Sequence, residues 1–381
     1  MSEAAGSAAP ERLVIPAGLR PADGRFGSGP TKVRAAQVEA LAAAGQSLLG
    51  TSHRQAPVRN LVQRVREGLA TLLSLPDDYM VVVGNGGTTA FWESAAFGLI
   101  SAKAQHLSFG EFSTKFANVT KTAPWLAEPS VIASEPGTHP FPQAEAGIDA
   151  YALTHNETST GVVMPIERVT GADAGSLVLV DATSAAGGIA VDPTQFDACY
   201  FAPQKCFGSD GGLWLALLSP AAVERAAQID ASDRYIPAFL SLQAAIDNSK
   251  LQQTYNTPAI ATLIMMAEQI DWMLEQGGMA WTTERTAASS GILYNWAEKS
   301  PVASPFVTDP ARRSPVAPTI DFADSVDAKK LSGVLRANGI VDTGGYAKLN
   351  RNQLRIGTFP AIEPSDVEAL TACIDYVLER M

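Results

Sequence analysis

The hydrophobic positions of the chain form short continuous runs that are separated by longer amphipathic stretches. The runs lie at residues 79–83, 177–180, 199–201 and 213–218. Short segments that are apolar at every position are typical of strands buried on both faces, as in a parallel sheet covered by helices. These runs therefore predict a large α/β domain.

Apolar residues at helical spacing lie before and between these runs. The predicted helices are 33–44, 58–73, 90–100 and 259–274, of which the last can continue toward Trp296. A short strand-like piece lies at 11–17, before a stretch rich in glycine and proline. Alternating strands and helices favour an α/β fold with parallel strand pairs.

The last hundred residues have a different pattern, which predicts a smaller α+β domain. Strands are predicted at 316–322 and 353–359 and helices at 326–337 and 364–379, with Ser365 as a candidate cap of the last helix. The full prediction is a disordered tail at 1–10, a large domain over 28–275, and a small domain built from 11–27 and 276–381.

Composition narrows the class of partner. The 381 residues include 28 Lys and Arg against 39 Asp and Glu, a formal net charge of −11. This charge argues against nucleic acid and against a membrane surface as the main partner, although it leaves room for a local cationic pocket. No window holds eighteen consecutive apolar residues, and the first ten residues do not resemble a signal peptide.

Cysteine and histidine usage excludes two further classes. The three cysteines, Cys199, Cys206 and Cys373, are too few and too scattered for a disulfide framework or a zinc site. The four histidines show no metal-binding spacing. We therefore expect no metal and a cytoplasmic location.

The segment VVVGNGGTTAFW predicts a strand, a tight turn and the start of a helix. Gly84, Gly86 and Gly87 allow close backbone approach, and Thr88 and Thr89 place hydroxyls beside free N–H groups at the positive end of the helix. This arrangement predicts a phosphate cradle, although a tight turn without a ligand fits the glycines equally well. No GK[ST] follows, and the last position of the dinucleotide-binding pattern is a threonine.

Two later apolar runs each end in a charged residue. Asp181 follows residues 177–180, and Lys205 follows 199–201 within PQKCFGSDGG. Open α/β sheets bind ligands at the carboxyl ends of their strands, and a desolvated lysine there can form a Schiff base with an aldehyde. A phosphate cradle, an aspartate for a pyridinium nitrogen and a lysine for an aldehyde together favour pyridoxal 5′-phosphate. Taken singly, the lysine could lie in a surface loop and the aspartate could cap a helix.

These residues and the segments around them resemble the phosphoserine aminotransferase family, which belongs to the fold-type I, class V pyridoxal-phosphate enzymes. The sequence most closely resembles the actinobacterial members of this family. The matching segments span nearly the whole chain in family order. They are GSGPT at 27–31, SHR at 52–54, GNGGTTAF at 84–91, FGEF at 109–112, HNETSTG at 155–161, VDATS at 180–184, APQKCFG at 202–208, YNTP at 255–258 and LRIGTF at 354–359. The resemblance implies a large, mostly parallel-sheet domain and a smaller α+β domain.

The resemblance also implies roles for residues around the cofactor. Lys205 resembles the Schiff-base lysine, and Gln204 resembles a phosphate ligand. Asp181 resembles the partner of the pyridinium nitrogen, and Thr158 the residue that bonds the ring hydroxyl. Phe112 stands where an aromatic residue stacks on the cofactor ring, a tryptophan in many relatives.

Two pairs of residues resemble the phosphate ligands of the family. Gly87 and Thr88 match its phosphate-binding turn. Asn256 and Thr257 resemble a pair that reaches the cofactor phosphate from the neighbouring subunit. The resemblance therefore implies a homodimer whose active sites are shared.

Three residues resemble the substrate ligands. Arg355 resembles the clamp for the α-carboxylate, and His53 and Arg54 the pair that holds the distal phosphate or the γ-carboxylate of glutamate across the dimer interface. Arginine suits these roles because its fork matches carboxylate and phosphate groups. Without the resemblance, solvated surface arginines would be the simpler interpretation.

The sequence departs from the family pattern at two places. Many relatives carry an arginine at the position of Thr88, so one positive charge is missing here. A second basic residue before the Arg355 strand is not cleanly matched, and either Lys348 or Arg351 could take its place.

The function that the resemblance implies is ping-pong transamination between glutamate and 3-phosphohydroxypyruvate in L-serine biosynthesis. The partners would be small anionic amino acids and keto acids. Four alternatives stay open from the residues: a class V aminotransferase of the alanine–glyoxylate type, a cysteine desulfurase-like enzyme, a nicotinamide-dependent oxidoreductase, and a non-catalytic binding protein. Activity on phosphohydroxythreonine is left undecided.

Overall fold

A computed structural model describes residues 13–381, so the tail predicted at 1–10 lies outside the described residues. The largest element is a seven-stranded sheet with the order β1-β9-β8-β7-β4-β2-β3. Its strands are β1 (Met80–Asn85), β2 (Ala104–Ser108), β3 (Ser130–Ala133), β4 (Ala150–Thr154), β7 (Leu177–Asp181), β8 (Ala198–Phe201) and β9 (Leu213–Leu218). The pairs from β3 to β8 are parallel, and β9 runs antiparallel to both β1 and β8. The predicted class, a mostly parallel α/β sheet, is confirmed.

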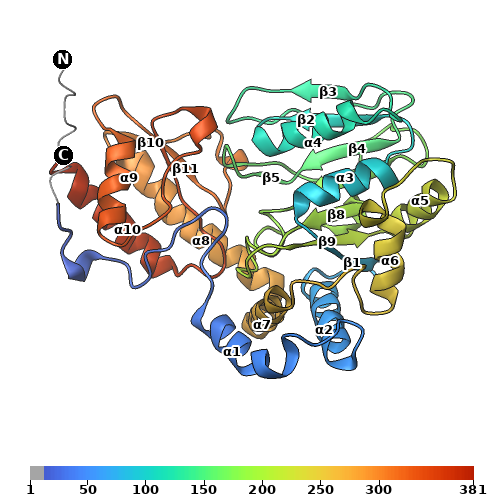
Figure 1. Cartoon of the computed structure of the whole chain (residues 1–381). Helices are drawn as coiled ribbons and strands as arrows, with labels where there is room; N and C mark the ends of the chain where they lie inside the picture. Colours follow the sequence, from blue (N-terminus) through green and yellow to red (C-terminus); the bar gives the residue numbers. More distant parts are fainter. Residues whose placement is uncertain (1–12) are drawn as a thin grey trace, which may run out of the picture.

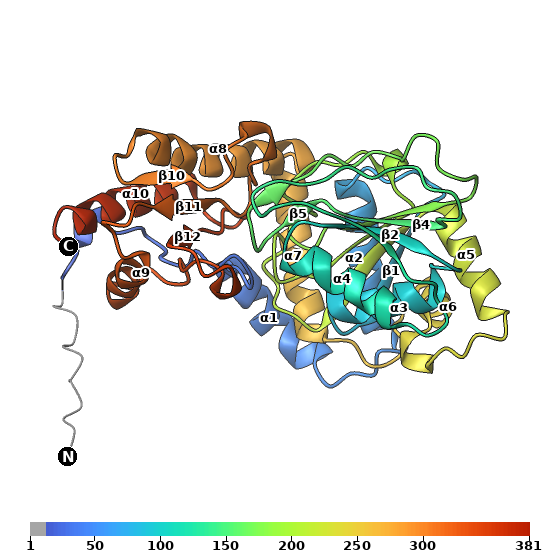
Figure 2. The same cartoon turned by 90° about the horizontal axis from the view of Figure 1, so that it is seen from above.

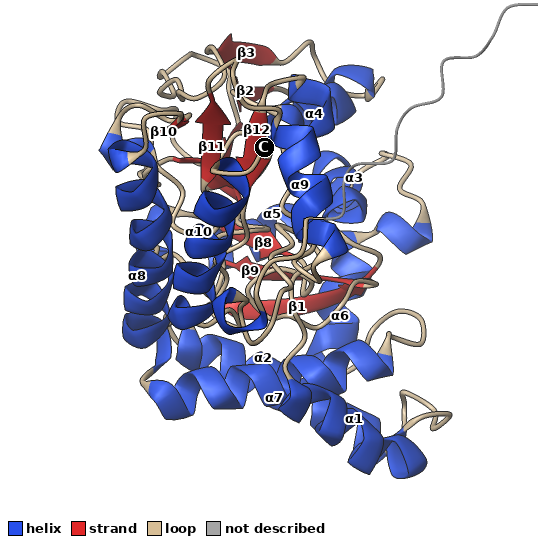
Figure 3. Cartoon of the chain, turned by 90° about the vertical axis from the view of Figure 1, so that its left-hand side faces the viewer, coloured by secondary structure: helices blue, strands red, loops and turns tan. Residues whose placement is uncertain are grey.

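Helices cover both faces of this sheet (Figures 1 and 3). Those of the large sheet are α1 (Ala35–Leu48), α2 (Ala56–Leu72), α3 (Thr88–Gly98), α4 (Glu111–Thr122), α5 (Pro220–Asp230), α6 (Leu242–Lys250) and α7 (Ile260–Gln276). Successive side chains of one strand enter different hydrophobic clusters: Val81 and Val83 pack with α2 and α7, whereas Val82 packs with α3 and α6. Because both faces are buried, the strands read as continuous apolar runs.

A second, three-stranded sheet lies beside the first (Figure 2). It consists of β10 (Ala303–Pro305), β11 (Thr319–Phe322) and β12 (Gln353–Arg355), all antiparallel. The helices that pack with it are α8 (Gly278–Lys299), α9 (Ala328–Ala337) and α10 (Pro364–Leu378). Ile15 and Phe26 join the same hydrophobic cluster, so the N-terminal segment packs with the C-terminal part of the chain. The exact domain boundaries stay a prediction.

Several predicted element boundaries need correction. The long helical pattern beginning near residue 259 is two helices, because Gly277 between α7 and α8 has φ +123°. Residues 13–16 form no strand, and the N–H of Ile15 bonds to the side chain of Asn338 at 2.9 Å instead. Ser365 is not the cap of the last helix, since Glu363 takes the cap position and Pro364 the first turn.

The strands predicted at 316–322 and 353–359 are shorter than expected. The observed strands are Thr319–Phe322 and Gln353–Arg355. The remaining apolar residues, such as Val316 and Phe359, are buried outside regular strands. Between residues 13 and 381, no helix is both long and apolar enough to cross a membrane.

Candidate active site

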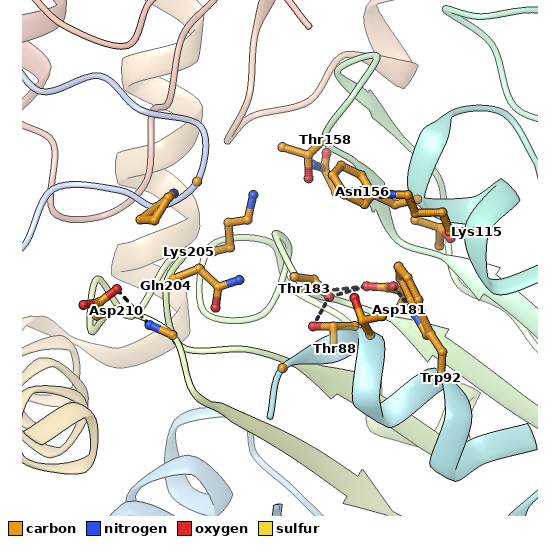
Figure 4. A pocket seen from close by; sticks show the side chains of 17 residues that line it. Thr88, Trp92, Lys115, Asn156, Thr158, Asp181, Thr183, Gln204, Lys205 and Asp210 are labelled. Carbon is orange, nitrogen blue, oxygen red and sulfur yellow. Dashed lines mark hydrogen bonds between the residues drawn. The ribbon is translucent and has the colours of Figure 1, made fainter. Parts of the chain in front are cut away.

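A cavity of about 420 Å³ opens at the carboxyl ends of the parallel strands, at the edge where β4 and β7 end (Figure 4). Its wall is built by the segments that follow β1, β4, β7 and β8, by the first turns of α3 and α4, and by residues 29 and 30. The predicted site residues that line it are Gly87, Thr88, Phe112, Thr158, Asp181, Gln204 and Lys205. Residues from separate parts of the chain are therefore brought together as the sequence predicts for an open α/β sheet.

Lys205 follows β8, and its side chain is almost completely enclosed. The residue is 8% exposed, and its Nζ donates to the backbone oxygen of Ser28 at 2.6 Å. Burial, together with the nearby positive charge of Arg355, lowers the pKa of this amine to about 8. A side chain at Gly29 would collide with Nζ, so glycine at this position leaves room for the lysine. The amine is therefore partly neutral near physiological pH.

Asp181 ends β7 and is 5% exposed. Its Oδ2 accepts from the indole N–H of Trp92 at 3.0 Å, and its Oδ1 accepts from the backbone N–H of Thr183 at 2.9 Å. Burial raises the pKa of this carboxyl to about 6, and the hydrogen bonds oppose that rise. The carboxylate is thus fixed in orientation and still mainly ionised at neutral pH.

The glycine-rich turn places the start of α3 at the cavity. Gly86 has φ +112°, and Gly87 is the residue that precedes Thr88 at the N-terminus of α3. The Thr183 hydroxyl lies 2.9 Å from the Thr88 hydroxyl and donates to Asp181 at 2.6 Å. Gly84 is needed for packing, because a side chain there would collide with the ring of Trp214.

Thr158 lies in the turn of a two-stranded hairpin, β5 (Asn156–Glu157) and β6 (Val162–Val163), and Arg355 at the end of β12 bonds to it beside the cavity. The Thr158 hydroxyl donates to Ser184 at 2.8 Å, and its backbone oxygen accepts from Nη1 of Arg355 at 2.8 Å. Burial lowers the pKa of Arg355, whose Nε is enclosed without a partner. Its guanidinium lies 5.1 Å from the ring centre of Tyr346. Arg355 does not line the cavity itself, although it lies close enough to affect Lys205.

The other predicted residues lie outside this cavity. The Thr257 hydroxyl is 3.3 Å from Nδ1 of His53, and the Asn85 side chain donates to the backbone oxygen of Thr257 at 2.9 Å. Asn256, Thr257 and Arg54 are exposed. Desolvation and the charge of Arg54 lower the pKa of His53. Within the described chain these residues form a separate surface cluster.

Neither Lys348 nor Arg351, the two candidates for the second basic residue of the substrate site, lines the cavity. Lys348 forms an ion pair with Glu111, and Arg351 pairs with Asp321 at 2.5 Å. Lys115 does line the cavity, with Nζ 5.6 Å from the ring centre of Phe112.

Ten of the residues that line the cavity are not among the predicted site residues: Gly29, Pro30, Thr89, Trp92, Lys115, Thr154, Asn156, Thr183, Asp210 and Gly211. A usable signal existed for Trp92, which lies one helical turn after Thr88 and therefore on the same face of α3.

Comparison with known proteins defines the class to which this fold and site belong. A family model described as aminotransferase class-V matches residues 144–362, and the chain belongs to this family. Within it the chain belongs with the phosphoserine aminotransferases, as the sequence motifs predicted. A phosphoserine aminotransferase from a Nocardioides species is 63% identical over 97% of this chain and 100% of its own length. A relative from Mycobacterium leprae is 58% identical over 97% of this chain and 98% of its own length.

Solved structures confirm the fold. A phosphoserine aminotransferase from Cytophaga hutchinsonii superposes with a TM-score of 0.86 at 23% identity, covering 93% of this chain and 99% of that one. An alanine–glyoxylate aminotransferase from Nostoc gives a TM-score of 0.75 at 19% identity, covering 97% of both chains. At these identities the likeness concerns the fold alone, and the predicted fold-type I class is confirmed.

Proposed function

We propose that this protein is a pyridoxal 5′-phosphate-dependent transaminase that exchanges an amino group between glutamate and 3-phosphohydroxypyruvate, giving 2-oxoglutarate and phosphoserine. It would serve L-serine biosynthesis in the cytoplasm. The observation that carries the proposal is the placement of the buried Lys205 amine in one cavity with the Asp181 carboxylate and the start of α3. Identity of 63% to a phosphoserine aminotransferase over the full length of that relative supports the substrate pair.

The residues of the cavity fit the cofactor. Gln204 and Asn156 each have a buried side-chain oxygen without a hydrogen-bond partner. Open space lies where a side chain at Gly87 would point, beside the N-terminus of α3. These features suit a phosphorylated, polar aromatic ligand, since buried polar atoms are normally paired. When bound, the cofactor supplies an electron sink for negative charge that develops at the substrate Cα.

Lys205 and Asp181 would perform complementary tasks. Because its pKa is lowered to about 8, the Lys205 amine would be available to hold the cofactor through its aldehyde carbon and to carry a proton to and from the substrate Cα. Asp181, largely ionised at neutral pH, would hold the pyridine nitrogen in its protonated form. Phe112 would cover one face of the ring, and Thr158 would bond the ring hydroxyl.

Substrate anions would meet cationic groups from two subunits. Arg355 would clamp the α-carboxylate, because its fork lies beside Thr158 at the cavity rim. His53 and Arg54 would hold the distal anion, and Asn256 and Thr257 the cofactor phosphate, in a neighbouring subunit. Their position on the surface, outside the cavity of their own chain, supports a homodimer with shared sites.

A cysteine desulfurase needs an accessible, reactive thiol. Cys199, Cys206 and Cys373 are all buried, and burial raises the pKa of each thiol. These cysteines therefore suit packing rather than nucleophilic attack, which disfavours the desulfurase alternative.

A panel of amino donors tests the proposal. The protein loaded with pyridoxal 5′-phosphate is supplied with phosphoserine, alanine or cysteine as the amino donor, each with 2-oxoglutarate and, in a parallel series, with glyoxylate as the acceptor. We expect phosphoserine to be preferred by at least about a hundredfold in kcat/KM, the scale on which a site built for a charged group rejects analogues that lack it. Preference for alanine with glyoxylate would favour the other class V activity, and sulfide release from cysteine would favour the desulfurase.

A further inference from the structure

Glu157 is a fully buried acidic residue that none of the proposed chemical steps uses. It is 0% exposed and lies between Asn156 and Thr158, two residues of the cavity wall. Among the described residues no lysine, arginine or histidine forms an ion pair with it; the ion pairs of the neighbourhood involve Glu111 instead. A buried carboxylate without a cation needs hydrogen-bond donors to offset its desolvation.

Five donors surround this carboxyl group. Oε2 accepts from the backbone N–H of Phe112 at 3.1 Å, the N–H of Ser113 at 2.9 Å and the Ser113 hydroxyl at 3.0 Å. Oε1 accepts from the N–H and the hydroxyl of Ser159 at 3.1 and 2.6 Å. Three of the five are backbone N–H groups, which can only donate, so hydrogen bonds take the place of a neighbouring cation.

The first three donors belong to the N-terminal turn of α4. The N–H groups of a first helical turn lack intrahelical partners and carry the positive end of the helix dipole. The residue before this helix is Gly110, which has no side chain to cap it, and a side chain there would collide with Glu157. Glu157 therefore caps α4 from outside the helix and fixes the position of Phe112 on it.

The same residue also holds the loop that carries Thr158. Its backbone oxygen accepts from the N–H groups of Thr160 at 3.2 Å and Gly161 at 2.9 Å, which closes the turn around Thr158. The backbone oxygen of Thr158 in turn receives Nη1 of Arg355. Glu157 thus links Phe112 of α4, through its carboxylate, with the turn between β5 (Asn156–Glu157) and β6 (Val162–Val163) and, through that turn, with β12 of the small sheet.

We infer that Glu157 is a positioning residue, which holds Phe112 and Thr158 in the arrangement that receives the cofactor and, through Thr158, orients Arg355. The inference rests on the proposed function for the identity of the cofactor. The inference also applies to the cofactor-free protein, because the hydrogen bonds of Glu157 need no ligand. Glu157 should therefore hold Phe112 and Thr158 in place before the cofactor binds.

The test compares Glu157→Gln with Asp149→Asn. Asp149 provides a control for the backbone hydrogen bonds because its carboxylate also accepts three backbone N–H groups, those of Ser101, Ala102 and Lys103, at 2.6–2.8 Å. Unlike Glu157 it also pairs with a cation, Arg225, at 3.1 Å. It directly precedes β4, at the opposite end of that strand from Glu157. Both variants replace one carboxylate oxygen by an N–H₂ group that cannot accept.

Two measurements separate positioning from general stability. In the cofactor-free protein, Glu157→Gln should increase hydrogen exchange at the amides of Phe112 and Ser113, whereas Asp149→Asn should increase it only near residues 101–103. The dissociation constant of pyridoxal 5′-phosphate, followed by tryptophan fluorescence, should rise about tenfold or more in Glu157→Gln, the effect of losing one charge-assisted hydrogen bond. In Asp149→Asn it should stay within about twofold.

A third readout reports on ring stacking directly. The visible circular dichroism of the bound cofactor should change in Glu157→Gln and be unchanged in Asp149→Asn. Wild-type exchange at residues 112 and 113 together with wild-type cofactor affinity in Glu157→Gln would overturn the inference.

If Glu157→Gln does not fold, the double variant Ser113→Ala/Ser159→Ala removes two of the five hydrogen bonds and keeps the charge. A raised dissociation constant in this variant supports the inference, and an unchanged one contradicts it. None of these measurements requires turnover. A protein that fails to transaminate phosphoserine but shows these effects would therefore refute the proposed function alone.

Discussion

The guanidinium of Arg355 faces the ring of Tyr346 at 5.1 Å from its centre, while Nη1 bonds the backbone oxygen of Thr158. The arginine is thereby held by an aromatic face on one side and a carbonyl on the other. Within the described residues its buried Nε has no partner and Nη1 makes its only side-chain hydrogen bond, so the edge formed by Nε and Nη2 is left for a substrate carboxylate. The arrangement makes Tyr346 a support for the predicted carboxylate clamp.

Replacing Tyr346 by alanine should weaken substrate binding without changing the cofactor. A cation–π contact of a partly buried arginine contributes about 1–2 kcal/mol, so KM for glutamate and for phosphoserine should both rise about five- to thirtyfold. Tyr346→Phe keeps the ring and should stay within about twofold of the wild type. Equal KM values for the alanine variant and the wild type, measured by steady-state kinetics, would contradict this role.

The indole N–H of Trp92 helps to keep Asp181 ionised, because this hydrogen bond lowers the pKa of the carboxyl against the effect of burial. In Trp92→Phe that pKa should move above its value of about 6. The acidic limb of the pH profile of kcat should therefore shift to higher pH, with little change at alkaline pH.

Trp296→Phe is the matched control for this experiment, since Trp296 donates to Asp375 at 2.8 Å in the small-sheet region. Its pH profile should coincide with that of the wild type. A shift in both variants, or in neither, would show that the indole of Trp92 does not tune Asp181.

Asp181 should also make the stability of the cofactor-free protein depend on pH. Its folded pKa of about 6 lies above the ordinary 3.8, so the folded state binds the proton more tightly than the unfolded state does. This contribution is therefore favourable below about pH 4 and is lost as the pH rises to 6. Asp181→Asn removes the charge and should raise the free energy of unfolding by up to about 3 kcal/mol above pH 6, from a shift of about two pH units.

Urea unfolding of the cofactor-free wild type and Asp181→Asn at pH 4 and pH 8 measures this difference. The gain of the variant should be present at pH 8 and nearly absent at pH 4. A gain that is the same at both values would assign it to packing rather than to the buried charge.

Mixing two inactive variants tests whether sites are shared between subunits. Arg54→Met should impair the site of the neighbouring subunit, whereas Lys205→Ala impairs its own. In a random mixture half of the dimers are hybrids, and each hybrid retains one intact site, so about a quarter of the wild-type activity should return after subunit exchange. A mixture of Arg355→Met and Lys205→Ala should recover none, because both residues serve the site of their own chain.

Recovery of activity in the mixture that contains Arg355→Met would contradict the assignment of Arg355 to the site of its own chain. Absence of recovery in the mixture that contains Arg54→Met would contradict the assignment of Arg54 to the neighbouring site. Native mass spectrometry of the mixtures confirms that hybrids have formed.

The sequence alone predicted the large sheet and the strand-end position of Asp181 and Lys205. These features follow from local patterns: continuous apolar runs identify strands buried on both faces, and parallel strands bring their carboxyl ends to one edge. The apolar runs at 79–83, 177–180, 199–201 and 213–218 correspond to β1, β7, β8 and β9 within two residues at each end.

Contacts between distant elements could not be predicted in the same way. Whether Lys348 or Arg351 is available depends on which carboxylate lies opposite, and the fold places Glu111 and Asp321 there. The role of Glu157 could not be predicted from the segment HNETSTG, because its hydrogen-bond donors on α4 lie more than forty residues earlier in the chain. Such pairings depend on how the elements pack, which hydrophobic periodicity does not encode.

We propose that the Lys205 amine carries the cofactor and moves the proton during transfer of the amino group of phosphoserine. The rate of glutamate formation from phosphoserine and 2-oxoglutarate by Lys205→Ala, with cofactor trapping by borohydride measured on the same samples, tests this role. We expect a loss of at least about 10³-fold in kcat and no trapped cofactor. A variant that retains activity within tenfold of the wild type, or that still yields trapped cofactor, would contradict it.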